Sequence, residues 1–238
     1  MQERPASSGL IHPALLKRSP GCSTIPPLMK PCPERSTPLA TDRPVSESFT
    51  SAAPISASEA RFSQDGAYRW WLTRCWGSSG RTLLFLGLNP SRADGVRQDP
   101  TLRRLIGFAR AWGYDALVVV NLFARVSPSS AELLRLADPM GPWADFILQQ
   151  WCHRWANSPQ WDLWCGWGNG GCCDERHHSV RTLLWPMLLL RLKRCPHRPG
   201  PLMLGLTRNG QPRHPLYASK QLNLQPFTWA GPSTIRHP

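Results

Sequence analysis

No part of the sequence is apolar for long enough to cross a membrane as a helix. The most apolar run, Leu183–Leu190, is short, contains Pro186 and is followed by basic residues, whereas a spanning helix needs about 20 mostly apolar residues. The first apolar stretch of the chain is broken by His12 and Pro13, unlike the continuous apolar region of a secretory signal. We therefore expect a cytoplasmic protein with no membrane partner.

The eight cysteines lack any repeated spacing. This absence excludes the paired CxxC arrangement that is typical of structural zinc sites. Cysteine and histidine pairs do gather in one stretch, but neighbours in sequence rarely converge on a single ion; the residues are Cys165, Cys172, Cys173, His177 and His178. We expect no metal and no cofactor, and we interpret the cysteines as reduced thiols that are mostly buried.

Acidic residues are scarce: 15 Asp and Glu stand against 28 Lys and Arg, which gives a net charge of +13. Residues 1–60 hold six basic and five acidic side chains, so +12 belongs to the rest of the chain. A strongly positive folded region favours an anionic partner such as nucleic acid, a nucleotide or an acidic surface. An Arg-rich composition without such a partner explains the charge equally well.

Composition divides the chain into three parts. Residues 1–60 are rich in Ser, Pro and Thr and show no sustained apolar periodicity, which predicts a disordered extension. Residues 61–228 contain the periodic apolar segments and have the length of one domain. Residues 229–238 form a C-terminal tail.

Buried strands alternate with amphipathic helices along the domain. Apolar runs of strand length occur at residues 82–88, 116–120, 161–165 and 202–206, after an initial strand at 68–74. Helical periodicity occupies residues 99–112, 127–137, 143–155 and 176–193. This alternation predicts an α/β fold of three layers, with a four-stranded, mainly parallel sheet covered by helices on both faces.

Polar or glycine-rich segments follow the predicted strands, and ligands of such sheets bind beyond the carboxyl ends of the strands. These segments are Asn89-Pro90-Ser91, Asn121, Gly166-Trp167-Gly168 and the stretch around His214. Each also has a plainer interpretation: Asn89 before a proline suits a turn, Asn121 could brace a loop, and His214 could bond a backbone carbonyl.

The charged residues near these strand ends also have both a functional and a plain interpretation. Asp99 precedes Pro100, which is typical of a helix N-cap rather than of a catalytic acid. Asp94 shows no such local role and is the better candidate for an acid, a base or a cation ligand. Arg103 and Arg104 lie off the apolar stripe of their helix, where solvent exposure is the plain interpretation and phosphate contact the alternative.

Several motifs occur together in the domain. They are Gly87–Asp94, Asp99–Thr101, Arg103-Arg104, Trp112–Tyr114, Val120–Ala124, Trp167-Gly168, Gly205–Thr207, Gly210, Pro212 and His214–Tyr217. As a set they resemble a bacterial family catalogued as domain of unknown function 1643, over about residues 68–227. That resemblance implies no established activity.

The strand that ends at Asn89, the strand that ends at Asn121 and the late His214-Pro215 resemble, more distantly, the uracil-DNA glycosylase superfamily. The resemblance implies a four-stranded parallel sheet flanked by helices, and hydrolysis of an N-glycosidic bond. It implies that Asn89 positions the attacking water, that Asn121 reads the base edge and that His214 supports charge on the departing base. Such chemistry needs a flipped base and a donor aimed at the leaving group.

The same resemblance places Leu216 or Tyr217 where a loop enters the DNA minor groove. Ser91 stands where that superfamily has an aromatic residue or glycine, and no strong base occurs within the first motif. Trp167 follows a strand end and could stack on a base.

We therefore predict a nucleic-acid- or nucleotide-binding protein, and for an enzyme of this kind the expected activity is hydrolysis of an N-glycosidic bond. The alternatives are a non-catalytic nucleic-acid-binding module and a small-molecule enzyme that uses Asp94 with a divalent cation. The candidate catalytic residues are Asn89, Asp94 and His214. The candidate base- or ligand-binding residues are Ser91, Asn121, Phe123, Trp167 and Tyr217, and the candidate phosphate contacts are Arg92, Arg103, Arg104 and Arg213. The sequence does not predict the oligomeric state.

Overall fold

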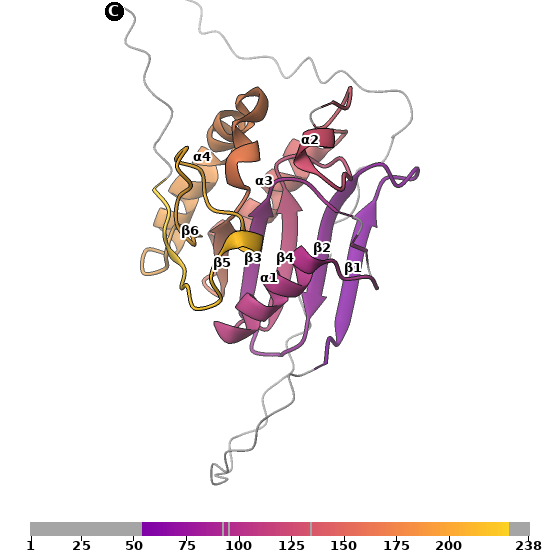
Figure 1. Cartoon of the computed structure of the whole chain (residues 1–238). Coiled ribbons are helices and arrows are strands. Elements are labelled where there is room, and N and C mark those ends of the chain that lie inside the picture. The colour runs from indigo at the N-terminus through magenta and orange to yellow at the C-terminus, as the bar shows by residue number, and fades with distance from the viewer. Residues whose placement is uncertain (1–53, 92, 95, 134, 229–238) are drawn as a thin grey trace, which may run out of the picture.

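The computed structural model describes residues 54–228 except 92, 95 and 134 (Figure 1). In that part of the chain seven strands form one sheet in the order β1-β2-β4-β3-β5-β6-β7. The strands are β1 (Ala57–Phe62), β2 (Arg69–Cys75), β3 (Thr82–Gly87), β4 (Ala116–Asn121), β5 (Trp161–Cys165), β6 (Pro201–Met203) and β7 (Gln225–Pro226). The helices are α1 (Pro100–Ala111), α2 (Ser130–Leu133), α3 (Ala144–Asn157) and α4 (Arg176–Arg194), with short 3-10 helices η1 (Gly168–Glu175) and η2 (Pro215–Tyr217).

The prediction of an α/β fold with a single sheet is confirmed, but the prediction of four strands is wrong. The four expected strands are present as neighbours in the order β4-β3-β5-β6, and all pairs within this group are parallel. β1 and β2 extend the sheet antiparallel at one side, and β7 pairs antiparallel with β6 at the other. The sheet is therefore mixed, with a parallel centre.

The expected boundary at residue 60 falls inside β1, which pairs with β2 along its whole length. Residues 1–53 and 229–238, which carry the predicted extension and tail, lie outside the described residues, as does Arg92.

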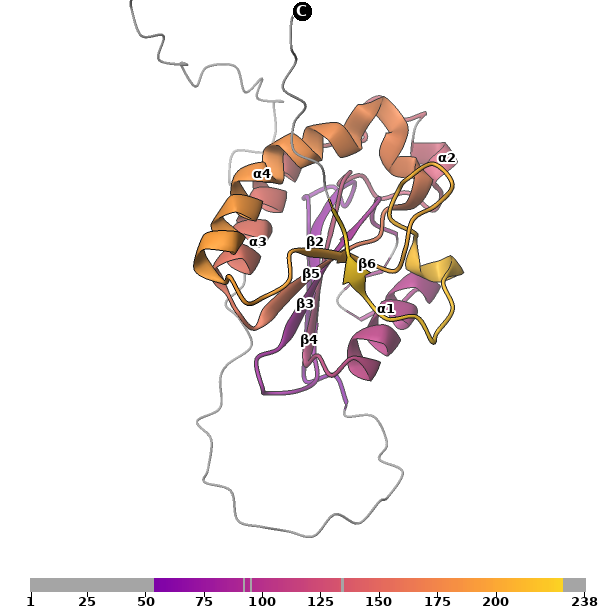
Figure 2. The same ribbon diagram turned by 90° about the vertical axis from the view of Figure 1, so that its left-hand side faces the viewer.

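Helices cover both faces of the sheet (Figure 2). On β3 and β4 successive side chains alternate between two cores: Leu84 and Leu86 pack with α3 and α4, whereas Leu83 and Phe85 pack with α1. Because both faces of these strands are buried, the strands are apolar throughout. The C-terminal segment that contains η2 lies on the α1 side and contacts that helix.

The predicted helix start at Asp99 is confirmed. The Asp99 carboxylate accepts a hydrogen bond from the Leu102 N–H at 2.6 Å, and Pro100 occupies the first helical position. α2 is much shorter than the predicted helix 127–137, while α4 runs through Pro186 without interruption.

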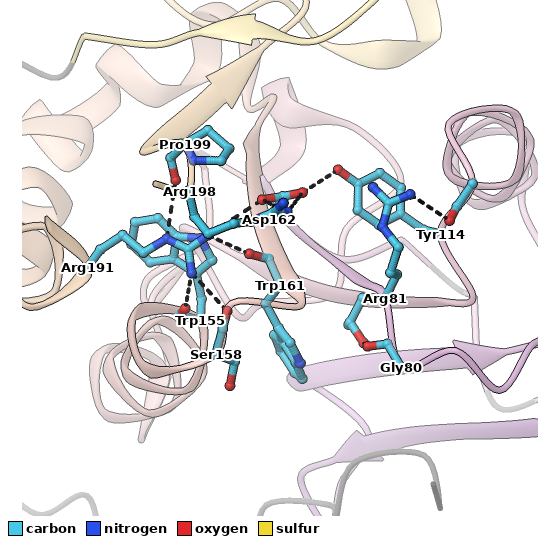
Figure 3. Close-up of polar contacts among 12 residues, drawn as sticks. Gly80, Arg81, Tyr114, Trp155, Ser158, Trp161, Asp162, Arg191, Arg198 and Pro199 are labelled. Atoms are coloured by element: carbon cyan, nitrogen blue, oxygen red, sulfur yellow. Dashed lines mark hydrogen bonds and ion pairs between the residues drawn. The ribbon is translucent and has the colours of Figure 1, made fainter. Parts of the chain in front are cut away.

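A buried ionic cluster ties the amino end of β5 to its surroundings (Figure 3). Asp162 is 3% exposed and accepts hydrogen bonds from the Tyr114 hydroxyl at 2.8 Å and from Arg198 at 2.9 and 3.1 Å. Arg191, from α4, lies 3.5 Å from the same carboxylate and donates to the carbonyls of Trp155, Ser158 and Trp161. The cluster fixes α4 and the loop after α1 at the edge of the sheet that lies opposite the carboxyl ends of β3, β4 and β5.

Within the described residues, Cys152, Cys165 and Cys195 are buried free thiols, and Cys172 and Cys173 are free near the surface. Cys75 departs from the expectation of reduced thiols, because its sulfur is part of a disulfide. No helix of the described segments has the length and hydrophobicity of a membrane span.

Candidate functional site

The ends of β3, β4 and β5 open into a cavity of about 520 Å³. Its walls come from the loops after these three strands, the first turn of α1 and the segment around η2. This volume lies within the range of about 300 to 1,000 Å³ that is usual for small-ligand pockets.

The topology explains why the cavity forms there. β3 is connected through α1, on one face, to its neighbour β4, and the chain then returns through α3, on the opposite face, to β5 on the other side of β3. The loops after β3 and β5 therefore diverge and leave a crevice at the carboxyl ends of these strands, which is the usual ligand position of such sheets.

Asn89, Asn121 and His214 all line this cavity. They reach it from three separate segments: the loop after β3, the last residue of β4, and the residue that caps η2. The structure therefore brings these three predicted residues to one cavity.

Asn121 is 7% exposed, and its Nδ2 group has no hydrogen-bond partner among the described residues. Leaving a buried donor unpaired costs about 1–3 kcal/mol. A ligand acceptor in the cavity would satisfy this group.

Asn89 uses its amide nitrogen within the protein. Nδ2 donates to the Ser127 carbonyl at 3.0 Å and to the carbonyl of the next residue, Pro90, at 3.1 Å. The Asn89 nitrogen therefore ties the turn at Pro90 to the loop at Ser127, in keeping with the plain interpretation of Asn89 as a turn residue. The side-chain carbonyl oxygen is left as the group that can accept from a ligand or a water.

His214 is held as a neutral donor. Its Nδ1 accepts a hydrogen bond from the Leu216 N–H at 3.3 Å, so the ring proton of the neutral form lies on Nε2. Burial lowers the pKa of His214 to about 4, against a smaller opposing effect of the Asp99 carboxylate. At neutral pH the ring therefore carries no charge and has its Nε2–H as a single hydrogen-bond donor.

Glycines at the strand ends allow an aromatic ring to form part of the cavity wall. A Cβ on Gly87 would lie 2.8 Å from both the Asn121 Oδ1 and the Phe85 ring, and one on Gly166 would lie 2.6 Å from that ring. Phe85 lines the cavity. Both glycines are therefore needed for Phe85 and Asn121 to occupy their positions.

Three further predicted residues line the cavity. Ser91 donates to the Asp99 carboxylate, which also faces the cavity. Trp167 is 2% exposed and donates through Nε1 to Gln211 at 2.7 Å, so it is a fixed wall. Tyr217 is 81% exposed and lies at the rim.

The interpretation of Asp94 as a residue without a local role is wrong. Its carboxylate accepts from the Val96 N–H at 2.8 Å and from the Arg97 N–H at 2.7 Å, and it does not line the cavity. These backbone bonds lower the pKa of Asp94. Asp94 therefore stabilises a turn.

The remaining predicted residues lie elsewhere. Phe123 is 1% exposed and packs in the core on the α3 side. Arg104 donates to the carbonyls of Pro215 and Ala218 and so fixes η2 on α1. Arg103 and Arg213 are exposed and do not line the cavity.

The sequence interpretation missed Arg69, the first residue of β2, whose buried side chain lines the cavity. The sequence feature that could have indicated Arg69 is a charged residue at the start of a strand that is otherwise buried. Among the described residues no group of three or more Cys, His, Asp and Glu could hold a metal ion.

Comparison with family models gives a match over most of the described residues. The model of a family described as "Protein of unknown function (DUF1643)" matches residues 69–216. No curated protein and no solved structure matches the chain.

Proposed function

The chain belongs to the DUF1643 family of proteins of unknown function, and from its site we propose that it binds nucleic acid or a nucleotide and takes one nucleobase into the cavity. The observation that carries this proposal is that Asn89, Asn121 and His214 line a single cavity of ligand size. A neutral amide and a neutral imidazole suit a planar, uncharged ligand with hydrogen-bonding edges, and an Asn side chain is well matched to a base edge. The net charge of +13 supports attraction of the phosphates that accompany the base.

As the reaction of this site we propose hydrolysis of the N-glycosidic bond. Water adds at the sugar carbon, the bond to the base nitrogen breaks with its electron pair leaving on the base, and the proton of the water ends on the base. The Asn89 oxygen is available to accept a hydrogen bond from the water, and the His214 Nε2–H to donate to the departing base. The motif resemblance to the uracil-DNA glycosylase superfamily supports the same assignment.

The cavity offers no free carboxylate to activate the water. Asp99, the one carboxylate among its described lining residues, is occupied by Ser91 and the Leu102 N–H. The proposed reaction therefore depends on stabilising the departing base rather than on a strong base. The alternative in which Asp94 binds a divalent cation loses its support, because that carboxylate stabilises a turn outside the cavity.

The test is incubation of the full chain with single strands and duplexes that carry deaminated or alkylated bases, followed by detection of abasic sites. We expect abasic sites with at least one substrate, and a loss of more than about 10-fold in rate for Asn121→Ala and His214→Ala, as for removal of a single oriented donor. Asn157→Ala, at the exposed end of α3, is the control and should retain the rate.

The outcomes separate the two parts of the proposal. Intact strands together with saturable, salt-sensitive binding would leave a non-catalytic binding module and would remove the hydrolysis. Failure to bind any nucleotide or oligonucleotide would remove the whole proposal.

A further inference from the structure

Arg69 presents a buried guanidinium group to the cavity. The residue is 4% exposed, and Nη1 donates to the Ala93 carbonyl at 2.8 Å. Its Nε has no hydrogen-bond partner among the described residues, although it is fully buried. Arg69 lines the same cavity as Asn121. The cavity wall thus contains a second buried donor without a partner, and this one is charged.

The charge of Arg69 is not neutralised by an ion pair within the described residues. The acidic group that acts on the Arg69 charge is Asp99, and its carboxylate already accepts from Ser91 and from the Leu102 N–H. Burial lowers the pKa of Arg69 to about 10 even though the Asp99 carboxylate opposes that change. A buried cation in this state is stabilised by an anion that enters the site.

The first turn of α1 contributes further donors at the same cavity. Thr101 lines it, and the Thr101 N–H donates to no described residue. Pro100 has no N–H to offer, and α1 has no acidic residue in its first turn. A helix N-terminus of this kind attracts anions. The Asp99 carboxylate at the N-cap opposes that attraction, so net binding of an anion depends on Arg69.

We infer that Arg69 and the first turn of α1 form an anion subsite of the cavity, which binds a phosphate group of the ligand. The ligand is then a nucleotide or a phosphodiester, rather than a free base or nucleoside. The choice of a nucleotide rests on the proposed function, whereas the anion subsite rests on Arg69 and α1 alone.

The chain contains a matched control for Arg69. Arg74 lies on the same strand, is 1% exposed, and donates to the carbonyls of Thr73 and Asp94. It therefore braces the loop before α1 much as Arg69 does through Ala93, but it does not line the cavity. Loss of binding that comes only from a displaced loop should follow from either substitution.

The test is calorimetric titration of the full chain with inorganic phosphate, with the deoxynucleosides, and with their 5′-monophosphates. We expect the wild type to bind a monophosphate at least about 10-fold more tightly than the nucleoside, as is reasonable for one charge-assisted contact. Arg69→Gln should bring that ratio to about one with little change for the nucleoside, and Arg74→Gln should keep it. If Arg69→Gln fails to fold by circular dichroism, Arg69→Lys replaces it and should reduce the ratio by about 3-fold or more.

The inference is overturned if the wild type does not distinguish nucleoside from monophosphate, or if the preference survives in the Arg69 variants. An equal loss for both ligands in Arg69→Gln would also overturn it, since that marks a loop brace. Phosphate binding that depends on Arg69, without nucleoside or nucleotide binding, would keep the anion subsite and remove the proposed function. If no probe binds, both are wrong.

A further titration, with a short oligonucleotide, shows whether the bound phosphate belongs to a free nucleotide or to a nucleic-acid strand. If the strand supplies it, Arg69→Gln should reduce the salt slope of oligonucleotide binding by about one, and Arg74→Gln should leave it unchanged. An unchanged slope in Arg69→Gln would assign the subsite to mononucleotides.

Discussion

His214 shows how one backbone contact sets the chemistry of a side chain. Because Nδ1 accepts from the Leu216 N–H, protonation of the ring would remove that bond and place a charge in a mostly buried position. The same effect links His214 to stability. Its pKa is about 4 in the folded protein and 6.5 in an unfolded chain, so between these values the unfolded state binds more protons.

We therefore expect the free energy of unfolding to be fully retained above pH 6.5 and to fall by about 3 kcal/mol as the pH drops toward 4, from this residue alone. Urea titrations of the wild type and of His214→Gln between pH 4 and 7 measure the difference. If both proteins lose stability in parallel over that range, His214 is not buried as a neutral ring.

Gly87 limits how the cavity can be built. Gly87→Ala places a Cβ 2.8 Å from the Asn121 Oδ1 and the Phe85 ring, and we expect a loss of about 1–3 kcal/mol in unfolding free energy, as is usual for overpacking. Gly107→Ala is the control: it lies in α1 with no atom within 4 Å of the added Cβ, and it should raise stability by up to about 1 kcal/mol. Equal effects at the two positions would contradict the close packing at Gly87.

Single residues also show what sequence could and could not predict of the site. Asp99 was predictable as a cap, because the signal is the adjacent Pro100. The local role of Asp94 depends on the turn that brings the Val96 and Arg97 N–H groups to its carboxylate. Periodic patterns of apolar residues predict helices and strands but not such a turn. Arg69 was missed because its importance comes from contact between β2 and the loop before α1.

At the scale of elements, the central strands were predictable because burial on both faces makes them continuously apolar. β1 was not, since Ala57–Phe62 contains no fully buried side chain and has two charged residues, Glu59 and Arg61. Its strand conformation comes from pairing with β2, which reflects the general dependence of strands on context. β7 comprises only Gln225–Pro226 and gives no pattern at all.

The ionic cluster around Asp162 gives a test of element packing that is separate from the cavity. Asp162→Asn removes the charge that faces Arg191 and Arg198, and we expect a loss of about 3–5 kcal/mol in unfolding free energy, as for a broken buried ion pair. Glu132→Gln, on the exposed surface of α2, should change it by less than about 0.5 kcal/mol. Thermal and urea unfolding measure both; a neutral Asp162→Asn would mean that the cluster does not hold α4 in place.

At the scale of the whole molecule, the cavity is the product of topology. Parallel strands bring their carboxyl ends to one edge, so the sequence could predict that the segments at Asn89, Asn121 and His214 lie near one another. It could not predict which side chains face inward: Phe123 directly follows the same strand region as Asn121 yet is buried against α3. Successive side chains of a strand point to opposite faces of the sheet. An error of one residue in the predicted end of a strand therefore reverses the predicted direction of every side chain near that end.

In the proposed function, Asn89, Asn121 and His214 hold the same ligand. The most direct test is a titration of ¹⁵N-labelled protein with deoxynucleoside 5′-monophosphates, followed through the side-chain amides of both asparagines and the ring nitrogens of His214. We predict that all three signals shift with one common dissociation constant. Shifts that saturate at different concentrations, or a side chain among the three that does not respond while binding occurs, would mean that these residues do not share a ligand.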